Sequence, residues 1–329
     1  MKLGVDAINL AADRRGMGRV VRKTLEDLQR LGVTPTLIVR NARDAEALET
    51  IETTQLPVVT AGSLWRRRLD RVWYPWNGMR FSPHAYSIAT VHDPFAFTYP
   101  HHEFVARWRE QAPIKRAIAR ADRLTAVSAW TANEIVRLFP RAADRIEVVP
   151  NAVGEFWKPV ERREQEPYFF FLAGRESRKN TAMLFHAYEA AFAGGGPRLF
   201  VTGSLWEGDE AILNAMKAPH ARIDADDAQL RRLYGGALAV LVPSLAEGFG
   251  LPALEAMACG APVVAANTTA LPETCGGAAL LADPGDVDAW TKALQRLAAD
   301  RPLREDLRAR GLLRAADARH DRLAQALLR

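Results

Sequence analysis

The chain has 329 residues, 48% hydrophobic and 25% charged, which is typical of a folded protein and excludes a disordered one. Chains of this length exceed what one core usually supports, so we expect two domains of about 150 residues each. The net charge of +5 is concentrated in residues 1–159, where 24 Lys and Arg face 17 Asp and Glu, and this favours an acidic partner or an anionic surface.

The first half of the chain alternates between strand-like and helix-like segments. Short apolar runs predict strands, and apolar residues at helical spacing predict helices. The expected strands are residues 2–5, 36–39, 72–74, 87–91, 124–127 and 146–149. The expected helices are residues 19–31, 104–121 and 129–138, and Ser128 is expected to be the N-cap of the last one. Such alternation is typical of a parallel sheet with helices on both faces.

The pattern stops at Pro150 and starts again at Tyr168. The intervening residues are rich in proline and charge, which indicates a linker with a hinge near residues 150–166. Beyond it, we expect strands at residues 168–172, 199–201, 237–242 and 262–265. We expect helices at residues 181–192, 226–233, 251–258 and 287–297, and a helical tail. The fold class is therefore α/β, with two Rossmann-like domains at residues 1–159 and 160–310, and a C-terminal helix at residues 311–329.

The most informative stretch is PSLAEGFGLPALE, residues 243–255. A strand runs into a loop with two glycines, Gly248 and Gly250, and a helix follows, which is a common way to present backbone N–H groups to a phosphate. Glu247 in the loop and Glu255 in the helix add a carboxylate on each side. Taken alone, the same pattern also fits an ordinary strand–turn–helix with two surface glutamates.

This stretch resembles the E-x7-E signature of glycosyltransferase family 4, whose members have the GT-B fold. The likeness continues through AMACGAPVVA at residues 256–265 and LPE at residues 271–273. The resemblance implies that Glu255 binds the donor ribose and Glu247 the transferred sugar. It also implies that the backbone of Phe249, Gly250 and Leu251 meets the phosphates or the sugar.

A second group of residues, GRESRKN at 174–180, follows a strand and opens a helix. Cations beside a glycine can neutralise a diphosphate without a metal and stabilise the charge that grows on a leaving nucleotide. The family places a Lys and an Arg here, which makes Lys179 the lysine. Because this loop is one residue shorter than the common form, Arg175 and Arg178 compete for the other role, and we favour Arg175.

The N-terminal domain contributes two weaker motifs. Gly16 and Gly18 form a glycine loop that in this family lies against donor and acceptor, although a lone GxG is often a plain turn. His92 follows an expected strand, and the resemblance implies that it contacts the transferred sugar. Asp93 either positions the acceptor or caps a turn.

The resemblance implies an enzyme of the hexosyltransferase class that retains the anomeric configuration. Its N-terminal domain would bind the acceptor and its C-terminal domain a nucleotide-diphosphate sugar, GDP- or UDP-linked. The acceptor would be a glycan, a lipid-linked saccharide or a small molecule. We expect no catalytic metal and no cofactor beyond the donor. Two alternatives stay open: a catalytically silent partner that binds nucleotide sugar, and a nucleotide-sugar epimerase of the same fold.

Location and surface contacts are inferred from charge and aromatic content. No apolar run reaches the ~18 residues of a bilayer span, and the first carboxylate comes too early for a signal peptide. Two cysteines without metal or disulfide spacing fit a reducing cytoplasm. Tryptophans and basic residues at 65–76 and 107–116 fit a peripheral contact with the inner membrane face or a lipid-linked acceptor, and equally a solvated face over core tryptophans. No motif indicates nucleic acid binding.

Overall fold

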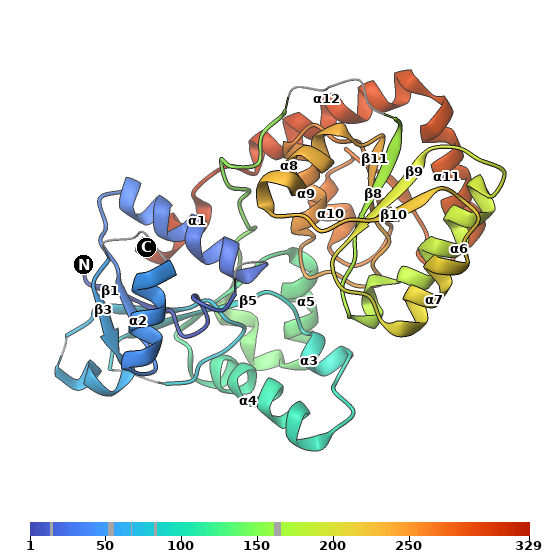
Figure 1. The fold of residues 1–329 in the computed structure, drawn as a ribbon. Helices are drawn as coiled ribbons and strands as arrows, with labels where there is room; N and C mark the ends of the chain where they lie inside the picture. The colour runs from blue at the N-terminus through green and yellow to red at the C-terminus, as the bar shows by residue number, and fades with distance from the viewer. Residues whose placement is uncertain (14–15, 52–55, 67, 82–83, 161–165) are drawn as a thin grey trace. The chain divides into compact units, whose positions relative to one another are not determined.

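The structure is a computed structural model that describes residues 1–13, 16–51, 56–66, 68–81, 84–160 and 166–329. The chain forms two compact units, and each is described by itself. Unit 1 comprises Met1–Ala152 together with His320–Arg329, and unit 2 comprises Val153–Arg319 (Figure 1). Residues 161–165 of the expected linker lie outside the described residues. None of the helices in the described ranges combines the length and apolar character needed to cross a bilayer.

Unit 1 is built on a parallel sheet of order β3-β2-β1-β4-β5-β6-β7. Its strands are β1 (Leu3–Asp6), β2 (Thr36–Val39), β3 (Val58–Thr60), β4 (Arg71–Tyr74), β5 (Tyr86–Val91), β6 (Arg123–Ala126) and β7 (Ile146–Val148). Its helices are α1 (Met17–Arg30), α2 (Ala42–Ile51), α3 (Phe95–Thr98), α4 (Phe104–Arg120), α5 (Ala129–Leu138) and α13 (Arg322–Leu328), with 3-10 turns at Ala61–Arg66 and Pro140–Arg145. The central strands are buried because helices cover both faces of a parallel sheet.

Unit 2 repeats this plan with a parallel sheet of order β10-β9-β8-β11-β12-β13. Its strands are β8 (Tyr168–Leu172), β9 (Arg198–Thr202), β10 (His220–Arg222), β11 (Ala239–Val242), β12 (Val263–Ala266) and β13 (Leu280–Ala282). Its helices are α6 (Thr181–Phe192), α7 (Glu207–Ala215), α8 (Asp227–Gly236), α9 (Leu251–Ala258), α10 (Leu271–Cys275), α11 (Val287–Ala299) and α12 (Arg301–Asp317), with a 3-10 turn at Ser177–Lys179. Within it, α11 packs on α6, and α12 packs on α9.

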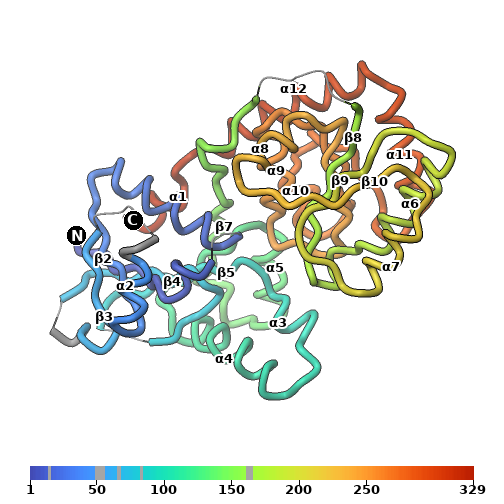
Figure 2. Tube along the Cα trace, in the orientation of Figure 1, coloured from blue at the N-terminus to red at the C-terminus, as the bar shows by residue number. Residues whose placement is uncertain are grey.

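The C-terminal segment returns to unit 1 after α12 ends, so both chain ends belong to unit 1 (Figure 2). There α13 packs on α1. Arg71 donates to the carbonyl oxygens of Leu327 and Arg329 at 2.9 and 2.7 Å, and Arg123 donates to Ala326. These arginines satisfy carbonyl groups that the last turn of a helix leaves unpaired. Whereas the sequence indicated one helix at residues 311–329, the structure has α12 starting at Arg301 and a separate α13.

Most expected elements are confirmed in type, and Ser128 is confirmed as the N-cap of α5, because its Oγ accepts from the Thr131 N–H at 3.0 Å. Two tryptophans contradict the expected membrane contact of residues 65–76. Trp73 and Trp76 are both buried in unit 1, and their indole N–H groups donate to Thr90 Oγ1 and the Asp6 carbonyl, respectively. They are core residues. Arg67 and the side chains of Trp65 and Arg66 lie outside the described residues.

Candidate active site

The loops that follow three neighbouring strands of unit 2 gather the predicted donor-site residues. Because β8, β11 and β12 are adjacent and parallel, their carboxyl ends meet at one edge of the sheet, where α/β proteins bind ligands. The loop after β8 carries Arg175, Arg178 and Lys179, and the loop after β11 carries Glu247. The structure therefore brings together the two motifs that lie about seventy residues apart in the sequence.

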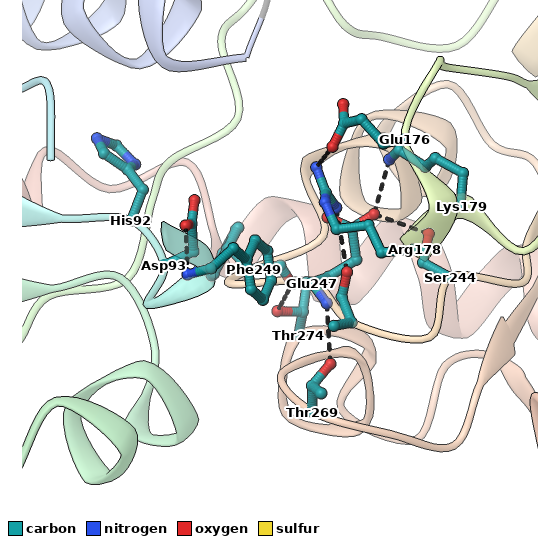
Figure 3. Close-up of polar contacts among 12 residues, drawn as sticks. His92, Asp93, Glu176, Arg178, Lys179, Ser244, Glu247, Phe249, Thr269 and Thr274 are labelled. Carbon is teal, nitrogen blue, oxygen red and sulfur yellow. Dashed lines mark hydrogen bonds and ion pairs between the residues drawn. The ribbon is translucent and has the colours of Figure 1, made fainter. Parts of the chain in front are cut away.

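Glu247 is the centre of an ion-pair cluster (Figure 3). Its Oε1 lies 2.7 Å from Lys179 Nζ, and its Oε2 lies 3.2 Å from an Arg178 guanidinium nitrogen. Ser244 Oγ donates a further hydrogen bond of 2.8 Å to Oε1. Arg178 also pairs with Glu176 and donates to the carbonyl oxygen of Ala246 at 3.1 Å. Both carboxylate oxygens of Glu247 are thus held by cations.

The charge state of Glu247 follows from this cluster. Burial alone would raise the pKa of the carboxyl, since only 7% of the residue is exposed. The charges of Lys179 and Arg178, together with the hydrogen bonds from Lys179 and Ser244, outweigh burial and lower the pKa to about 2. Glu247 is therefore ionised throughout the neutral range. Its Oε1 already accepts from Lys179 and Ser244, while Oε2 contacts Arg178 and keeps a further lone pair.

The backbone around Glu247 is fastened by residues that the sequence did not single out. The Glu247 N–H donates to Thr269 Oγ1 at 3.0 Å, and the Leu245 N–H donates to the Arg178 carbonyl at 2.7 Å. Thr269 has φ of 53°, an unusual conformation for a β-branched residue, and such strain concentrates at functional sites. Single Ser and Thr residues form no sequence pattern, so only the fold exposes their roles.

Asn180 links the cationic loop to the rest of the site. It adopts a left-handed conformation with φ of 56° between the 3-10 turn and α6. Its side-chain amide donates to the carbonyl oxygens of Pro243 and Pro284 at 3.1 and 2.7 Å. These two bonds connect the loop after β8 with the loops after β11 and β13. They therefore fix the backbone position from which the Lys179 side chain extends.

Arg175 differs from Arg178 in its surroundings. Its Nε donates to the Leu205 carbonyl at 2.9 Å, and the side chain is exposed. Across the described residues, its two terminal guanidinium nitrogens make no hydrogen bond or ion pair. Arg175 therefore has unused hydrogen-bond donors, whereas the guanidinium of Arg178 contacts Glu247, Glu176 and the Ala246 carbonyl.

The start of α9 presents backbone donors beside Glu247. Gly250 is its N-cap with φ of 101°, and a Cβ there would meet Leu271 Cδ2 at 2.7 Å. In the described part of the chain, the backbone N–H groups of Phe249, Gly250 and Leu251 have no hydrogen-bond partner, while the Phe249 carbonyl accepts from Thr274 Oγ1 at 2.5 Å. Three consecutive unpaired N–H groups at a helix start are suited to an anion.

The other residues predicted for this site lie around the same turn. Gly248 immediately precedes Phe249 in the loop, and Glu255 lies buried within α9, only 3% exposed. Burial, and to a lesser extent the charge of Glu255, raises the pKa of the Cys259 thiol. Glu247 thus precedes the free N–H groups in the chain, and Glu255 follows them within α9. Over the described ranges, no three His, Cys, Asp or Glu side chains gather as a metal site.

The remaining predicted residues belong to unit 1. His92 follows β5 and is buried, with Nε2 2.8 Å from the Pro75 carbonyl. Because a carbonyl only accepts, Nε2 carries the ring hydrogen, and burial lowers the pKa to about 4, so the imidazole is neutral. Asp93 Oδ1 accepts from the Phe95 N–H at 3.0 Å, which caps the turn into α3, one of its two predicted roles.

Gly16 and Gly18 form the start of α1. Gly16 is the N-cap with φ of 51°. A Cβ on Gly18 would lie 1.8 Å from the Asp13 carbonyl oxygen, so no other residue fits there without moving the backbone. Arg22 ties the same loop down by donating to the carbonyls of Asp13 and Leu10, both at 2.7 Å. Tight packing thus accounts for Gly18, and a ligand role stays a prediction.

The fold and this site define a class, a two-unit α/β protein with cationic side chains and unpaired backbone N–H groups at the carboxyl edge of a parallel sheet, and comparison with known proteins gives the family. A profile described as Glycosyltransferase Family 4 matches residues 14–154, and one described as Glycosyl transferases group 1 matches residues 154–314. O-antigen chain mannosyltransferase B from Escherichia coli is 34% identical over 74% of this chain and 70% of its own length. The chain belongs to glycosyltransferase family 4, has the GT-B fold and is a glycosyltransferase.

More distant relatives and solved structures agree. The MMP alpha-(1->4)-mannosyltransferase of Mycolicibacterium hassiacum is 30% identical over 64% of this chain and 56% of its own length. The serotype-specific mannosyltransferase WbdA of Escherichia coli is 29% identical over 60% of this chain but only 27% of its own length. The structure of Anabaena Alr3699/HepE in complex with UDP-glucose aligns with a TM-score of 0.76 at 15% identity, over 99% of this chain and 97% of that one. At such identity, the structural likeness shows the fold alone.

Proposed function

We propose that this enzyme transfers a hexosyl group, mannose in the first instance, from a nucleoside diphosphate sugar to a hydroxyl of a glycan or lipid-linked saccharide, with retention of anomeric configuration. Relatives named as mannosyltransferases support the sugar, and two of them are named for O-antigen chains. The solved neighbour with UDP-glucose supports a nucleotide-sugar donor of the UDP or GDP type.

One observation carries the proposal: the cations around Glu247 stand beside unpaired N–H groups of the α9 turn. In this assignment, Lys179 and Arg175 bind the diphosphate, and the backbone of Phe249, Gly250 and Leu251 completes its cradle. Glu247 accepts hydrogen bonds from the transferred sugar. Glu255 accepts from the ribose, for which a buried, fixed carboxylate is suited.

Arg175 and Arg178 take different roles in this assignment. Arg175 has free donors that a diphosphate oxygen can accept from, in the bidentate manner typical of arginine. Arg178 instead holds Glu247 Oε2 and the Ala246 carbonyl, and so keeps the sugar-binding carboxylate in place. The expectation that favoured Arg175 for the diphosphate thus gains support from its unused guanidinium nitrogens.

The proposed reaction is a substitution on one face of the sugar. The bond between the anomeric carbon and the diphosphate oxygen breaks, the acceptor oxygen bonds to that carbon from the same side, and the acceptor proton passes to the departing diphosphate. Lys179 and Arg175 stabilise the charge that grows on the leaving group, without a metal ion. Glu247 is a poor covalent nucleophile because Lys179, Arg178 and Ser244 already hold its oxygens.

Unit 1 supplies the acceptor side in this proposal. His92 is neutral, and with Nε2 engaged by Pro75 it retains Nδ1 as an acceptor for a hydroxyl of the transferred sugar. Gly16 and Gly18 bare the backbone at the start of α1, and in this proposal a donor or acceptor approaches that backbone. We assign the reaction to the cytoplasm, where the buried free thiols Cys259 and Cys275 stay reduced.

A donor screen tests this function. Thermal shift with UDP, GDP and ADP sugars should show one base that stabilises the fold by mass action, and that sugar should then be consumed with release of nucleoside diphosphate. Lys179→Ala should bind the donor more weakly and release little product. Binding without release would favour the silent partner, conversion of the sugar while it stays nucleotide-linked would favour the epimerase, and no binding of any donor would refute the proposal.

A further inference from the structure

The first two turns of α4 expose large apolar side chains. Phe104 is 71% exposed, Val105 56% and Trp108 61%, and Tyr99 just before the helix is 47% exposed. We call Tyr99, Phe104, Val105 and Trp108 the α4 patch. Scattered exposed apolar residues are ordinary, but four within ten residues of one segment form a concentrated surface feature.

The α4 patch contributes nothing to the core of unit 1. The buried residues of α4 are Ile114, Ala117 and Ile118, all in its second half. Phe104 and Trp108 are four residues apart, so they lie on one side of the helix, and Val105 lies next to them. Helical turns gain most of their stability from packing an apolar face, yet here Phe104, Val105 and Trp108 are each more than half exposed. The α3–α4 connection loops out from unit 1 (Figure 2).

The segment that carries the patch has more cations than acids. Residues 99–120 hold five Lys and Arg against two Asp and Glu. Arg107 stacks its guanidinium 5.8 Å from the Phe104 ring centre, and Arg109 is exposed on the next turn. An aromatic and aliphatic face flanked by arginines is the composition of helices that lie in the headgroup region of anionic membranes.

We propose that the α4 patch inserts into the headgroup region of an anionic lipid bilayer and holds the enzyme at a membrane surface. Trp108, Phe104 and Tyr99 enter the interface, where amphipathic rings are favoured, and Arg107 and Arg109 contact lipid phosphates. The excess positive charge favours this occupant over a second copy of the chain, because two such patches would repel each other. The inference is independent of the donor and of the sugar transferred.

Vesicle co-sedimentation of the full chain tests this surface. Wild type should bind vesicles of phosphatidylcholine with about a third phosphatidylglycerol, bind phosphatidylcholine alone weakly, and release in high salt. Trp108→Ser and Phe104→Ser should each lower the partition coefficient about tenfold, as expected when one aromatic side chain is not inserted. Arg109→Ser should weaken binding to the anionic vesicles and leave binding to neutral ones unchanged.

Trp206→Ser is the matched control, because Trp206 is comparably exposed at 53% but lies in unit 2 at the start of α7. It should bind vesicles as wild type does, and circular dichroism should confirm that all variants fold. The proposal is overturned if wild type does not bind anionic vesicles, or if Trp108→Ser binds as well as Trp206→Ser. It is equally overturned if sedimentation velocity shows a dimer that Trp108→Ser abolishes, since the α4 patch would then be a self-association surface.

Discussion

Replacing Glu247 by glutamine tests the ion-pair cluster through its pH dependence. The pKa of Glu247 falls from 4.5 to about 2 on folding. Each pH unit of that difference is worth about 1.4 kcal/mol, so ionised Glu247 contributes about 3 kcal/mol to folding at neutral pH. Because the folded pKa is the lower one, this contribution is fully present above pH 4.5 and is lost as pH falls towards 2. About 2 kcal/mol should be gone by pH 3.

The assay is equilibrium urea unfolding of wild type and Glu247→Gln at pH 7, 4 and 3. The free energy of unfolding of wild type should exceed that of the variant at pH 7, and the gap should shrink by about 2 kcal/mol by pH 3. Glutamine has no carboxyl to protonate, so the variant has no pH-dependent contribution from this position. Glu207→Gln, at an exposed position on α7, is the control for a surface Glu→Gln change and should lower the free energy of unfolding at pH 7 much less than Glu247→Gln does. A constant gap for Glu247→Gln would refute the ion-pair reasoning.

Four further predictions concern the same site. Arg175→Ala should raise the donor Kd and lower kcat by about a hundredfold, whereas Arg178→Ala should chiefly lower the melting temperature. Donor titration and thermal melts measure both effects, and the reverse pattern would mean that the two arginines have exchanged roles. Gly250→Ala should lower the free energy of urea unfolding by about 1–3 kcal/mol, because Gly250 has a positive φ and a Cβ there would contact Leu271. An unchanged free energy would contradict the backbone conformation described for this turn. Thr269→Val should lower kcat/KM about fivefold or more through loss of its Oγ1 bond, with Thr269→Ser close to wild type, and equal rates would show that the bond is not needed. EDTA should leave donor turnover unchanged, and a loss restored by added Mg²⁺ would contradict a metal-independent mechanism.

The sequence was sufficient for the architecture because long, strongly patterned elements dominate it. The apolar strand at residues 168–172 and the amphipathic helix at 129–138 are recognisable from period alone. Short elements escaped: β10 is only His220–Arg222, without an apolar run, and β3 is only Val58–Thr60. Such strands form because neighbouring strands pair with them, which no local pattern records.

Helix ends show the same limit. The expected helix at residues 226–233 continues to Gly236 in α8, although two glycines disfavour helix. A Cβ at Gly235 would meet Val160 at 2.5 Å, and one at Gly236 would meet the Tyr168 hydroxyl at 2.4 Å. Close tertiary packing therefore selects glycine inside this helix and overrides its propensity.

The site residues that belong to a sequence motif could be predicted, and the others could not. The resemblance singled out Glu247 and Lys179 as separate contacts to a donor, but their mutual ion pair at 2.7 Å was not foreseen. It arises because β8 and β11 are neighbours in the sheet. Ser244 and Thr269 carry no readable signal, since a hydroxyl that holds a loop has no fixed spacing. The roles of the donor-binding residues stay predictions.

The central claim is sugar transfer from a nucleotide donor at the Glu247–Lys179 site. Its most direct test is NMR observation of the enzyme with the nucleotide sugar selected by the donor screen and a mannose-terminated oligosaccharide. We predict nucleoside diphosphate release in step with a new glycosidic linkage of the same anomeric configuration as the donor, and loss of both signals in Lys179→Ala. A linkage of inverted configuration, or unchanged turnover in Lys179→Ala, would contradict the account.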